Sequence, residues 1–207
     1  VAEWFETRGI STETLIDLEI SEGPEYMPQT GKTENTIKFN YYVGSQLINV
    51  KYRDGRKNFK LYKGAEKVFY NINSIVGYDS CVITEGEMDV LALHEAGIRN
   101  AISVPNGATI THNNLDYLDN CIDYFEDKTK IILALDTDAP GLALRTEFVR
   151  RLGAEACFLV DFEDCKDANE YLMKYGKDKL KQAINKAKAY PLENVTTFKD
   201  IEGDVKD

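Results

Sequence analysis

Cysteine and histidine are scarce in this sequence: its 207 residues include four cysteines and two histidines. No two cysteines form a C-x-x-C pair. A structural zinc site needs four such ligands at short spacings, so we do not expect one. Cys81 and Cys157 stand in apolar, strand-like runs, which predicts buried free thiols. Neither His94 nor His112 is assigned a functional role.

Long apolar runs are also missing. No stretch approaches the ~20 apolar residues that cross a bilayer. The first residues have neither the basic start nor the apolar core of a signal peptide. We therefore expect a cytoplasmic protein without a membrane partner. The first residue is Val1 rather than Met, which fits a piece of a longer protein.

Positive charge is in short supply and is unevenly distributed. The net charge is −10, yet residues 51–70 contain seven basic and two acidic residues, so the rest of the chain carries −15. Proteins that bind single-stranded nucleic acid typically contact its phosphates with basic residues and stack its bases on aromatic rings. A hairpin with one solvated basic face is the alternative. The aromatic residues that interleave with these cations are Tyr52, Phe59, Tyr62, Phe69 and Tyr70.

The first third of the chain predicts a small α+β unit. Residues 1–18 have the pattern of a helix with a cap at Ser11. Residues 21–35 are polar, contain Gly and Pro, and predict a loop. β-Type residues then run on both sides of Gly44-Ser45, which is the spacing of a β-hairpin. We expect an antiparallel sheet over residues 36–70, within a first domain over residues 1–76.

From Gly77 onward, expected strands and helices alternate. This order is typical of an α/β fold with a short parallel sheet of about four strands flanked by helices. The expected strands are 81–84, 101–104, 130–135 and 157–160. One expected helix begins after Gly86. The other expected helices cover residues 113–127, 140–152, 167–175 and 177–188. We expect this domain to cover residues 77–190, followed by a polar tail or linker over residues 191–207.

Carboxylates follow three of these expected strands. Glu85 stands where the first strand ends, with Asp89 one helical turn later, and Asp136 and Asp138 follow the third strand. Because ligands of an open parallel sheet bind at the carboxyl ends of its strands, these acids should meet at one edge, where Asp167 is also expected. Repelling carboxylates need cations, and hard oxygen ligands suit Mg²⁺. The alternative is that each acid only caps a helix or begins a turn.

These motifs resemble the Toprim domain shared by primases, topoisomerases and some nucleases. Glu85 and Asp89 match its E-G-x-x-D form, and Asp136 and Asp138 match its D-x-D pair. More narrowly, the sequence is similar to the primase half of phage-type primase-helicases, including the Twinkle family. The segments that carry this resemblance are Ile83–Ala92, Ser103–Ala108, Lys166–Asn169, Arg8–Ser11 and Val50–Arg53.

The resemblance implies a DNA primase, a nucleotidyltransferase that makes short RNA primers. It would use ribonucleoside triphosphates, a single-stranded DNA template and Mg²⁺ or Mn²⁺. The implied catalytic residues are Glu85, Asp89, Asp136 and Asp138. The implied metal ligands are Glu85, Asp136, Asp138 and Asp167. The implied residues for holding template or triphosphate are Arg53, Lys57 and Lys60.

Other functions of the same fold stay open. A Toprim nuclease would use the same acids to attack phosphodiesters with water. A primase-like module of a replicative helicase would bind DNA without catalysis. The resemblance also implies a fused or separate replicative helicase as partner, and a bacterial, prophage or phage-encoded protein. The sequence has no cysteine set for the zinc-binding module that such primases often carry.

Polymerisation makes one further demand on the fold. A triphosphate brings negative charge that calls for Lys or Arg close to the acids and their metal ions. We therefore expect a cleft between residues 1–76 and the Toprim unit. Acids should line one wall, and Arg53, Lys57 or Lys60 should line the other.

Overall fold

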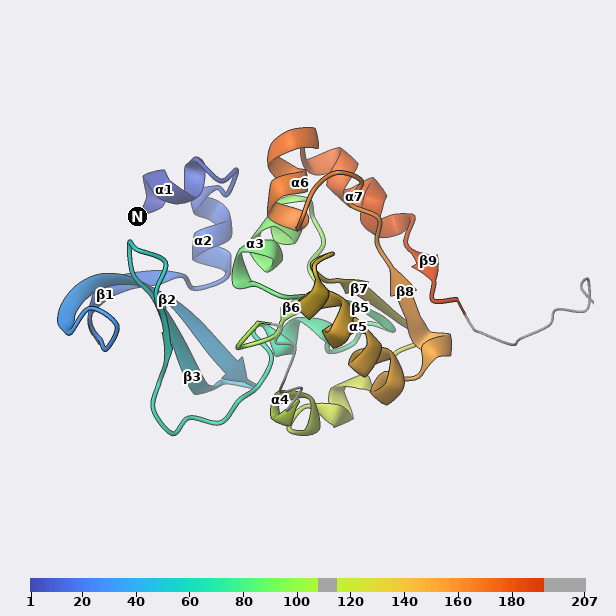
Figure 1. The fold of residues 1–207 in the computed structure, drawn as a ribbon, viewed down its shortest axis with the longest axis horizontal. Helices are drawn as coiled ribbons and strands as arrows, with labels where there is room; N and C mark the ends of the chain where they lie inside the picture. Colours follow the sequence, from blue (N-terminus) through green and yellow to red (C-terminus); the bar gives the residue numbers. More distant parts are fainter. Residues whose placement is uncertain (108–114, 192–207) are drawn as a thin grey trace, which may run out of the picture.

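The N-terminal part of the chain forms two short helices and a four-stranded antiparallel sheet in the order β1-β2-β3-β4 (Figure 1). The computed structural model describes residues 1–107 and 115–191. A break around Gly9, whose φ is +73°, divides the expected helix over residues 1–18 into two. The elements are α1 (Ala2–Glu6), α2 (Thr12–Asp17), β1 (Ser21–Met27), β2 (Lys32–Val43), β3 (Gln46–Arg53), β4 (Phe59–Leu61) and the 3-10 helix η1 (Ile72–Ile75).

The prediction of a loop over residues 21–35 is wrong, because β1 and the start of β2 occupy most of this segment. β1 pairs only with β2, at the edge of the sheet, where most of its side chains are exposed. An edge strand tolerates Pro24 and shows no apolar alternation, so its sequence resembles a loop. The strand is held by backbone pairing to β2, and the Thr36 hydroxyl adds a hydrogen bond to the Gly23 carbonyl (3.0 Å).

The second part of the chain forms a five-stranded sheet in the order β6-β5-β7-β8-β9. The first four strands are parallel, as expected, and a two-residue strand, β9, is added antiparallel to β8. The strands are β5 (Ser80–Thr84), β6 (Ala101–Ser103), β7 (Lys130–Ala134), β8 (Cys157–Leu159) and β9 (Lys188–Ala189). The helices are α3 (Glu87–Glu95), α4 (Asp116–Asp119), η2 (Ile122–Phe125), α5 (Ala139–Leu152), η3 (Ala154–Ala156), α6 (Ala168–Tyr175) and α7 (Lys177–Asn185).

One apolar core runs through both sheets. The backbones of Tyr70 and Ser103 exchange two hydrogen bonds (2.9 and 3.3 Å), which ties the N-terminal part to β6. The Tyr70 ring packs edge-on against Phe39 and Tyr41 of β2. Tyr70 and Phe69 are buried, so these two rings of the basic segment are core residues and cannot stack on bases. Cys81 and Cys157 are buried free thiols, as expected.

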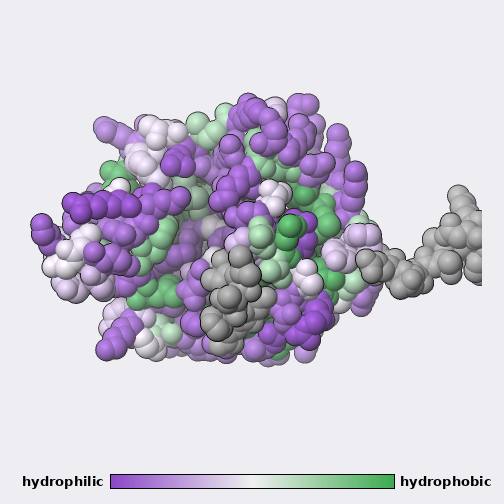
Figure 2. Space-filling view, in the orientation of Figure 1, coloured by the Kyte–Doolittle hydropathy of each residue, from purple (hydrophilic) through white to green (hydrophobic). Residues whose placement is uncertain are grey.

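Several expectations fall outside the described residues. They concern Ala108 at the end of one resembling segment, His112, the first part of the helix expected over residues 113–127, and nearly all of the tail over residues 191–207. Within residues 1–107 and 115–191, no helix is long and apolar enough to cross a membrane. Figure 2 shows that hydrophilic residues dominate the visible face, with small apolar areas among them.

Candidate active site between the two sheets

Glu85 links the ends of two parallel strands. It follows β5 directly, and the pairing of Thr84 with Ala134 places it beside the end of β7. Its Oε1 accepts a hydrogen bond from the Asp136 amide (3.0 Å). The side chain therefore closes the edge of the sheet at the point where open α/β folds bind ligands.

The two aspartates after β7 have different environments. The Asp136 carboxylate is largely buried and forms an ion pair with Lys166, whose Nζ is 2.7 Å from Oδ2. Burial raises the pKa of Asp136, and Lys166 opposes that shift. Asp138 is exposed and caps α5 by accepting a hydrogen bond from the Gly141 amide (3.0 Å). Asp138 therefore caps a helix, which was the alternative considered for each of these acids, and it lies at the same edge of the sheet as Asp136.

Gly141 allows α5 to approach the strand end closely. A Cβ at this position would lie 2.2 Å from the Asp136 carbonyl oxygen and 2.5 Å from Glu85 Oε1. Real side chains do not tolerate such contacts, because a backbone atom cannot move away cheaply. The glycine after the D-x-D pair is therefore required by packing against both acid-bearing segments.

Asp89 lies behind this group, buried on the first turn of α3. Burial raises its pKa well above the usual range, and the charges of Asp167, Asp136 and Glu85 raise it further. Its Oδ1 accepts a hydrogen bond from the Asn169 amide (3.1 Å), which joins α3 to α6. Asp167 caps α6 by accepting from the Glu170 amide (2.8 Å). The charges of three acids at the strand ends thus act on Asp89, so these four carboxylates converge on one region.

A cleft of about 280 Å³ separates these acids from the N-terminal sheet. Two of the cations predicted to face the acids, Arg53 and Lys57, line its other wall. The Arg53 guanidinium lies 4.3 Å from the centre of the Trp4 ring and 6.0 Å from that of Phe59. The wall therefore combines positive charge with aromatic surface. The acidic residues that line the cleft are Glu85, Glu87, Asp89, Asp136 and Asp167.

Lys60, the third predicted cation, is engaged elsewhere. Its Nζ is 2.5 Å from Glu25 and donates a hydrogen bond to the Tyr26 carbonyl (2.7 Å). Lys60 pairs with Tyr52 in the sheet, one residue away from the pair formed by Arg53 and Phe59. Successive residues of a strand point to opposite faces, so Lys60 directs its side chain away from the face of Arg53.

The turn at residues 54–58 positions Lys57. Burial alone would raise the pKa of Asp54, but hydrogen bonds from Asn58 and Arg56 outweigh it and lower the pKa. Asp54 Oδ1 accepts from the Arg56 and Asn58 amides (2.9 and 2.8 Å). These bonds fix a tight turn in which Lys57 has a φ of +67°. The ionised Asp54 therefore holds the loop that carries a cation of the cleft.

The site fits a divalent cation in its chemistry, but its ligands are not preassembled. Within the described residues, no three His, Cys, Asp or Glu side chains are arranged to hold a metal ion. The reason is that Glu85, Asp136, Asp138 and Asp167 each bind an internal partner. The donors are nevertheless all carboxylate oxygens, which suit Mg²⁺ or Mn²⁺, and Lys166 already neutralises Asp136 as a cation would. An ion held by Asp136 would therefore take the place of Lys166 at this carboxylate.

The structure brings further residues to the cleft that composition alone did not indicate. Trp4, Arg8, Lys166 and Asn169 line it together with the predicted residues. Asn169 also donates a hydrogen bond to the Arg8 carbonyl (2.9 Å), which connects α6 to the loop after α1. Three of these residues lie in the segments Arg8–Ser11 and Lys166–Asn169, which carried the resemblance, but only Asp167 of those segments was assigned a role.

Comparisons with known proteins agree with this architecture. The Toprim-like family matches residues 82–172. The chain is 36% identical to the primase homolog protein of Arabidopsis thaliana, over 94% of this chain and 61% of that protein. It is 34% identical to the chloroplastic/mitochondrial Twinkle homolog protein of the same plant, over 97% of this chain and 30% of that protein. It therefore spans less than two thirds of either relative. The bacterial or phage origin expected from the sequence stays a prediction.

A solved structure shares the fold of both parts. The primase fragment of the bacteriophage T7 primase-helicase superposes with a TM-score of 0.70 and 25% identity, over 86% of this chain and 70% of that fragment. The match extends well beyond the Toprim-like residues, so it includes the N-terminal sheet as well. The prediction of a Toprim domain preceded by a small antiparallel subdomain is thereby confirmed. Residues 82–172 thus form a Toprim-like domain, and the chain as a whole has the fold of the primase fragment of the T7 primase-helicase.

Proposed function

We propose that this chain is the catalytic core of a DNA primase, which joins ribonucleotides into short RNA primers on single-stranded DNA. The observation that carries the proposal is the cleft of about 280 Å³. Arg53 and Lys57 line one wall of it, and Glu85, Asp89 and Asp136 line the other. A polymerase needs both walls, because it must hold a triphosphate beside carboxylates that bind metal.

The residues would divide the work as follows. Arg53 and Lys57 would hold template or triphosphate, and the exposed ring of Phe59 offers apolar surface for a base. Asp89, through its bond to the Asn169 amide, would keep α6 in place rather than bind substrate.

The acids at the strand ends would hold Mg²⁺ or Mn²⁺. When bound there, the ion would stabilise negative charge on the attacking and departing oxygens. The proposed ligands are Glu85, Asp136, Asp138 and Asp167.

A primer-synthesis assay tests the proposal. The protein is incubated with single-stranded DNA, labelled ribonucleotides and Mg²⁺ or Mn²⁺, and short RNA is the expected product. Glu85→Gln should stop synthesis while DNA binding is retained. Glu147→Gln is the matched control, because Glu147 pairs with Arg150 on α5 and does not line the cleft.

The other outcomes identify the alternatives. Cutting of DNA without ribonucleotides, lost in Glu85→Gln, would indicate a Toprim nuclease. DNA binding with neither product would indicate a primase-like module without catalysis.

We further propose that the chain acts together with a replicative helicase. The support is that one relative is named a Twinkle homolog and a structural neighbour is part of a primase-helicase. Stimulation of primer synthesis by an added or fused helicase would test the partnership.

We also propose domain limits at residues 76/77 and 190/191, because the antiparallel sheet ends before Gly77 and the second sheet ends at Ala189.

A further inference from the structure

A second basic segment follows the Toprim strands. Residues 174–190 contain six lysines and one acid, Asp178, and so carry +5, as much as residues 51–70. Outside these two segments the chain has 12 basic and 32 acidic residues, a balance of −20. Because the rest of the chain is so acidic, each of these two basic segments is a candidate contact for an anionic ligand.

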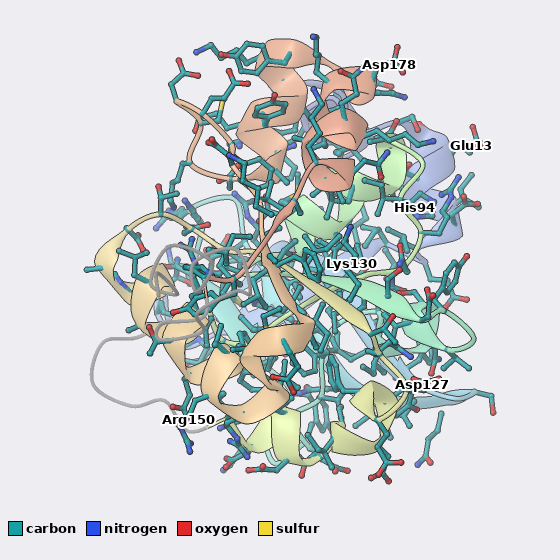
Figure 3. The ribbon with its side chains drawn as sticks, turned by 90° about the vertical axis from the view of Figure 1, so that its right-hand side faces the viewer. Glu13, His94, Asp127, Lys130, Arg150 and Asp178 are labelled. Carbon is teal, nitrogen blue, oxygen red and sulfur yellow. The ribbon has the colours of Figure 1, made fainter. Side chains whose placement is uncertain are left out.

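The lysines of this segment divide into two groups. Lys174 and Lys177 form ion pairs with Asp164 and Glu95. Helix α7 buries Leu180 and Ile184 against the core (Figure 3, where Asp178 marks the helix). The other four lysines are exposed: two lie on α7, one directly follows it, and Lys188 is in β9. Within the described residues, no ion pair is formed by Lys179, Lys181, Lys186 or Lys188.

Three of these lysines surround a hollow of about 260 Å³ beside α7: Lys179, Lys186 and Lys188, here called the α7 surface. Two acids also line this hollow, but both have partners. Asp161 Oδ1 accepts a hydrogen bond from the Glu163 amide (2.8 Å), and Glu163 Oε1 accepts one from the Tyr171 hydroxyl (3.3 Å). These hydrogen bonds from the loop and from α6 fix the positions of both carboxylates, and the lining of the hollow keeps a net charge of +1. The three ammonium groups form no ion pair within the described residues and can bind an external anion.

The hollow and the catalytic cleft lie on either side of one loop. Residues 160–167 lead from the end of β8 to the start of α6. Asp161 and Glu163 of this loop line the hollow, whereas Lys166 and Asp167 line the cleft. An extended strand that leaves the cleft across this loop therefore reaches the α7 surface next.

We propose that the α7 surface binds the sugar–phosphate backbone of a nucleic-acid strand that extends beyond the cleft. The ligand class rests on the proposed function, because it assumes that nucleic acid occupies the cleft. The cleft combines cations with the aromatic rings of Trp4 and Phe59, whereas the α7 surface offers ammonium groups around a largely buried Tyr171. Its contact is consequently independent of base sequence and strongly dependent on salt.

Length-dependent DNA binding tests this inference. Binding of the full chain is measured by fluorescence anisotropy from about 50 to 200 mM salt, with single strands of about 6 and about 20 nucleotides. The test variant is Lys179→Gln/Lys186→Gln/Lys188→Gln. The control variant, Lys32→Gln/Lys38→Gln/Arg150→Gln, removes the same charge from β2 and from α5. All three target lysines are exposed, so the fold should be retained, which circular dichroism checks.

For the longer strand, loss of three phosphate contacts should reduce the salt slope by about 2. The wild type should then lose roughly 20-fold more affinity than the test variant over this salt range. The short strand and the control variant should behave as the wild type does. An unchanged slope with the long strand, equal losses in both triple variants, or an equal loss with the short strand would overturn the inference. Failure of primer synthesis with these length effects intact would refute the proposed function and leave the α7 surface standing.

Discussion

A buried ion pair joins the two parts of the chain, and its removal gives a sharp test of how they are held together. Lys51 of β3 donates to both carboxylate oxygens of Glu87 on α3, at 2.8 and 3.0 Å. The Tyr41 hydroxyl donates to the same carboxylate (2.5 Å). Burial, and then Glu87, raises the pKa of Tyr41, so its hydroxyl remains a donor at neutral pH. Lys51 and Glu87 are 8% and 4% exposed, so both charges are largely removed from water.

The perturbation is the cycle of Lys51→Met, Glu87→Gln and the double variant. Removing one charge of a buried pair leaves the other without compensation and costs about 3–5 kcal/mol. In the double variant both charges are gone and the Gln can still accept from Tyr41. Its loss should therefore fall well below the sum of the single losses, with a coupling energy of about 2 kcal/mol or more.

Urea unfolding of the four proteins, followed by circular dichroism, measures these free energies. Lys60→Met is the matched control. Its pair with Glu25 is about one quarter exposed on each side, so its loss should cost about 0–1 kcal/mol. A cost for Lys51→Met no larger than that of the control, or additive single losses, would show that the buried pair does not hold the N-terminal sheet against α3.

Three further predictions concern the acid-bearing edge. Burial and like charges raise the pKa of Asp89. The stability contributed by its protonated form is therefore complete below about pH 4, the pKa in the unfolded chain, and is lost as pH rises through the pKa in the folded protein. Asp89→Asn should thus stabilise the protein at pH 7 in metal-free buffer, with no gain near pH 4; a gain that grew in acid would contradict this. Gly141→Ala should cost about 1–3 kcal/mol in thermal unfolding, whereas Gly55→Ala, which has open space, should cost far less. Asp138→Ala should lose about 1 kcal/mol of helix capping that Asp138→Asn retains, while calorimetry should show weaker Mg²⁺ binding in both; equal stabilities would argue against the cap.

Local sequence patterns predicted the elements whose side chains alternate or repeat regularly. Short apolar runs identified the four parallel strands, and β5, β6 and β7 are buried on both faces. Gly44-Ser45 identified the hairpin between β2 and β3, where Gly44 has a φ of +58°. β1 escaped prediction because backbone pairing, rather than an apolar side-chain pattern, defines a polar edge strand.

The candidate site shows the same division. The sequence by itself determined that Glu85, Asp136 and Asp167 follow strands of one parallel sheet, and strand polarity then brings them to one edge. Only the tertiary structure decided which cations face them. Alternation along β3 and β4 turns Lys60 towards Glu25, and packing against α3 commits Lys51 to Glu87. The ion pair between Lys166 and Asp136 depends on the path of a loop from another strand, and such long-range contacts leave no mark on local sequence periodicity.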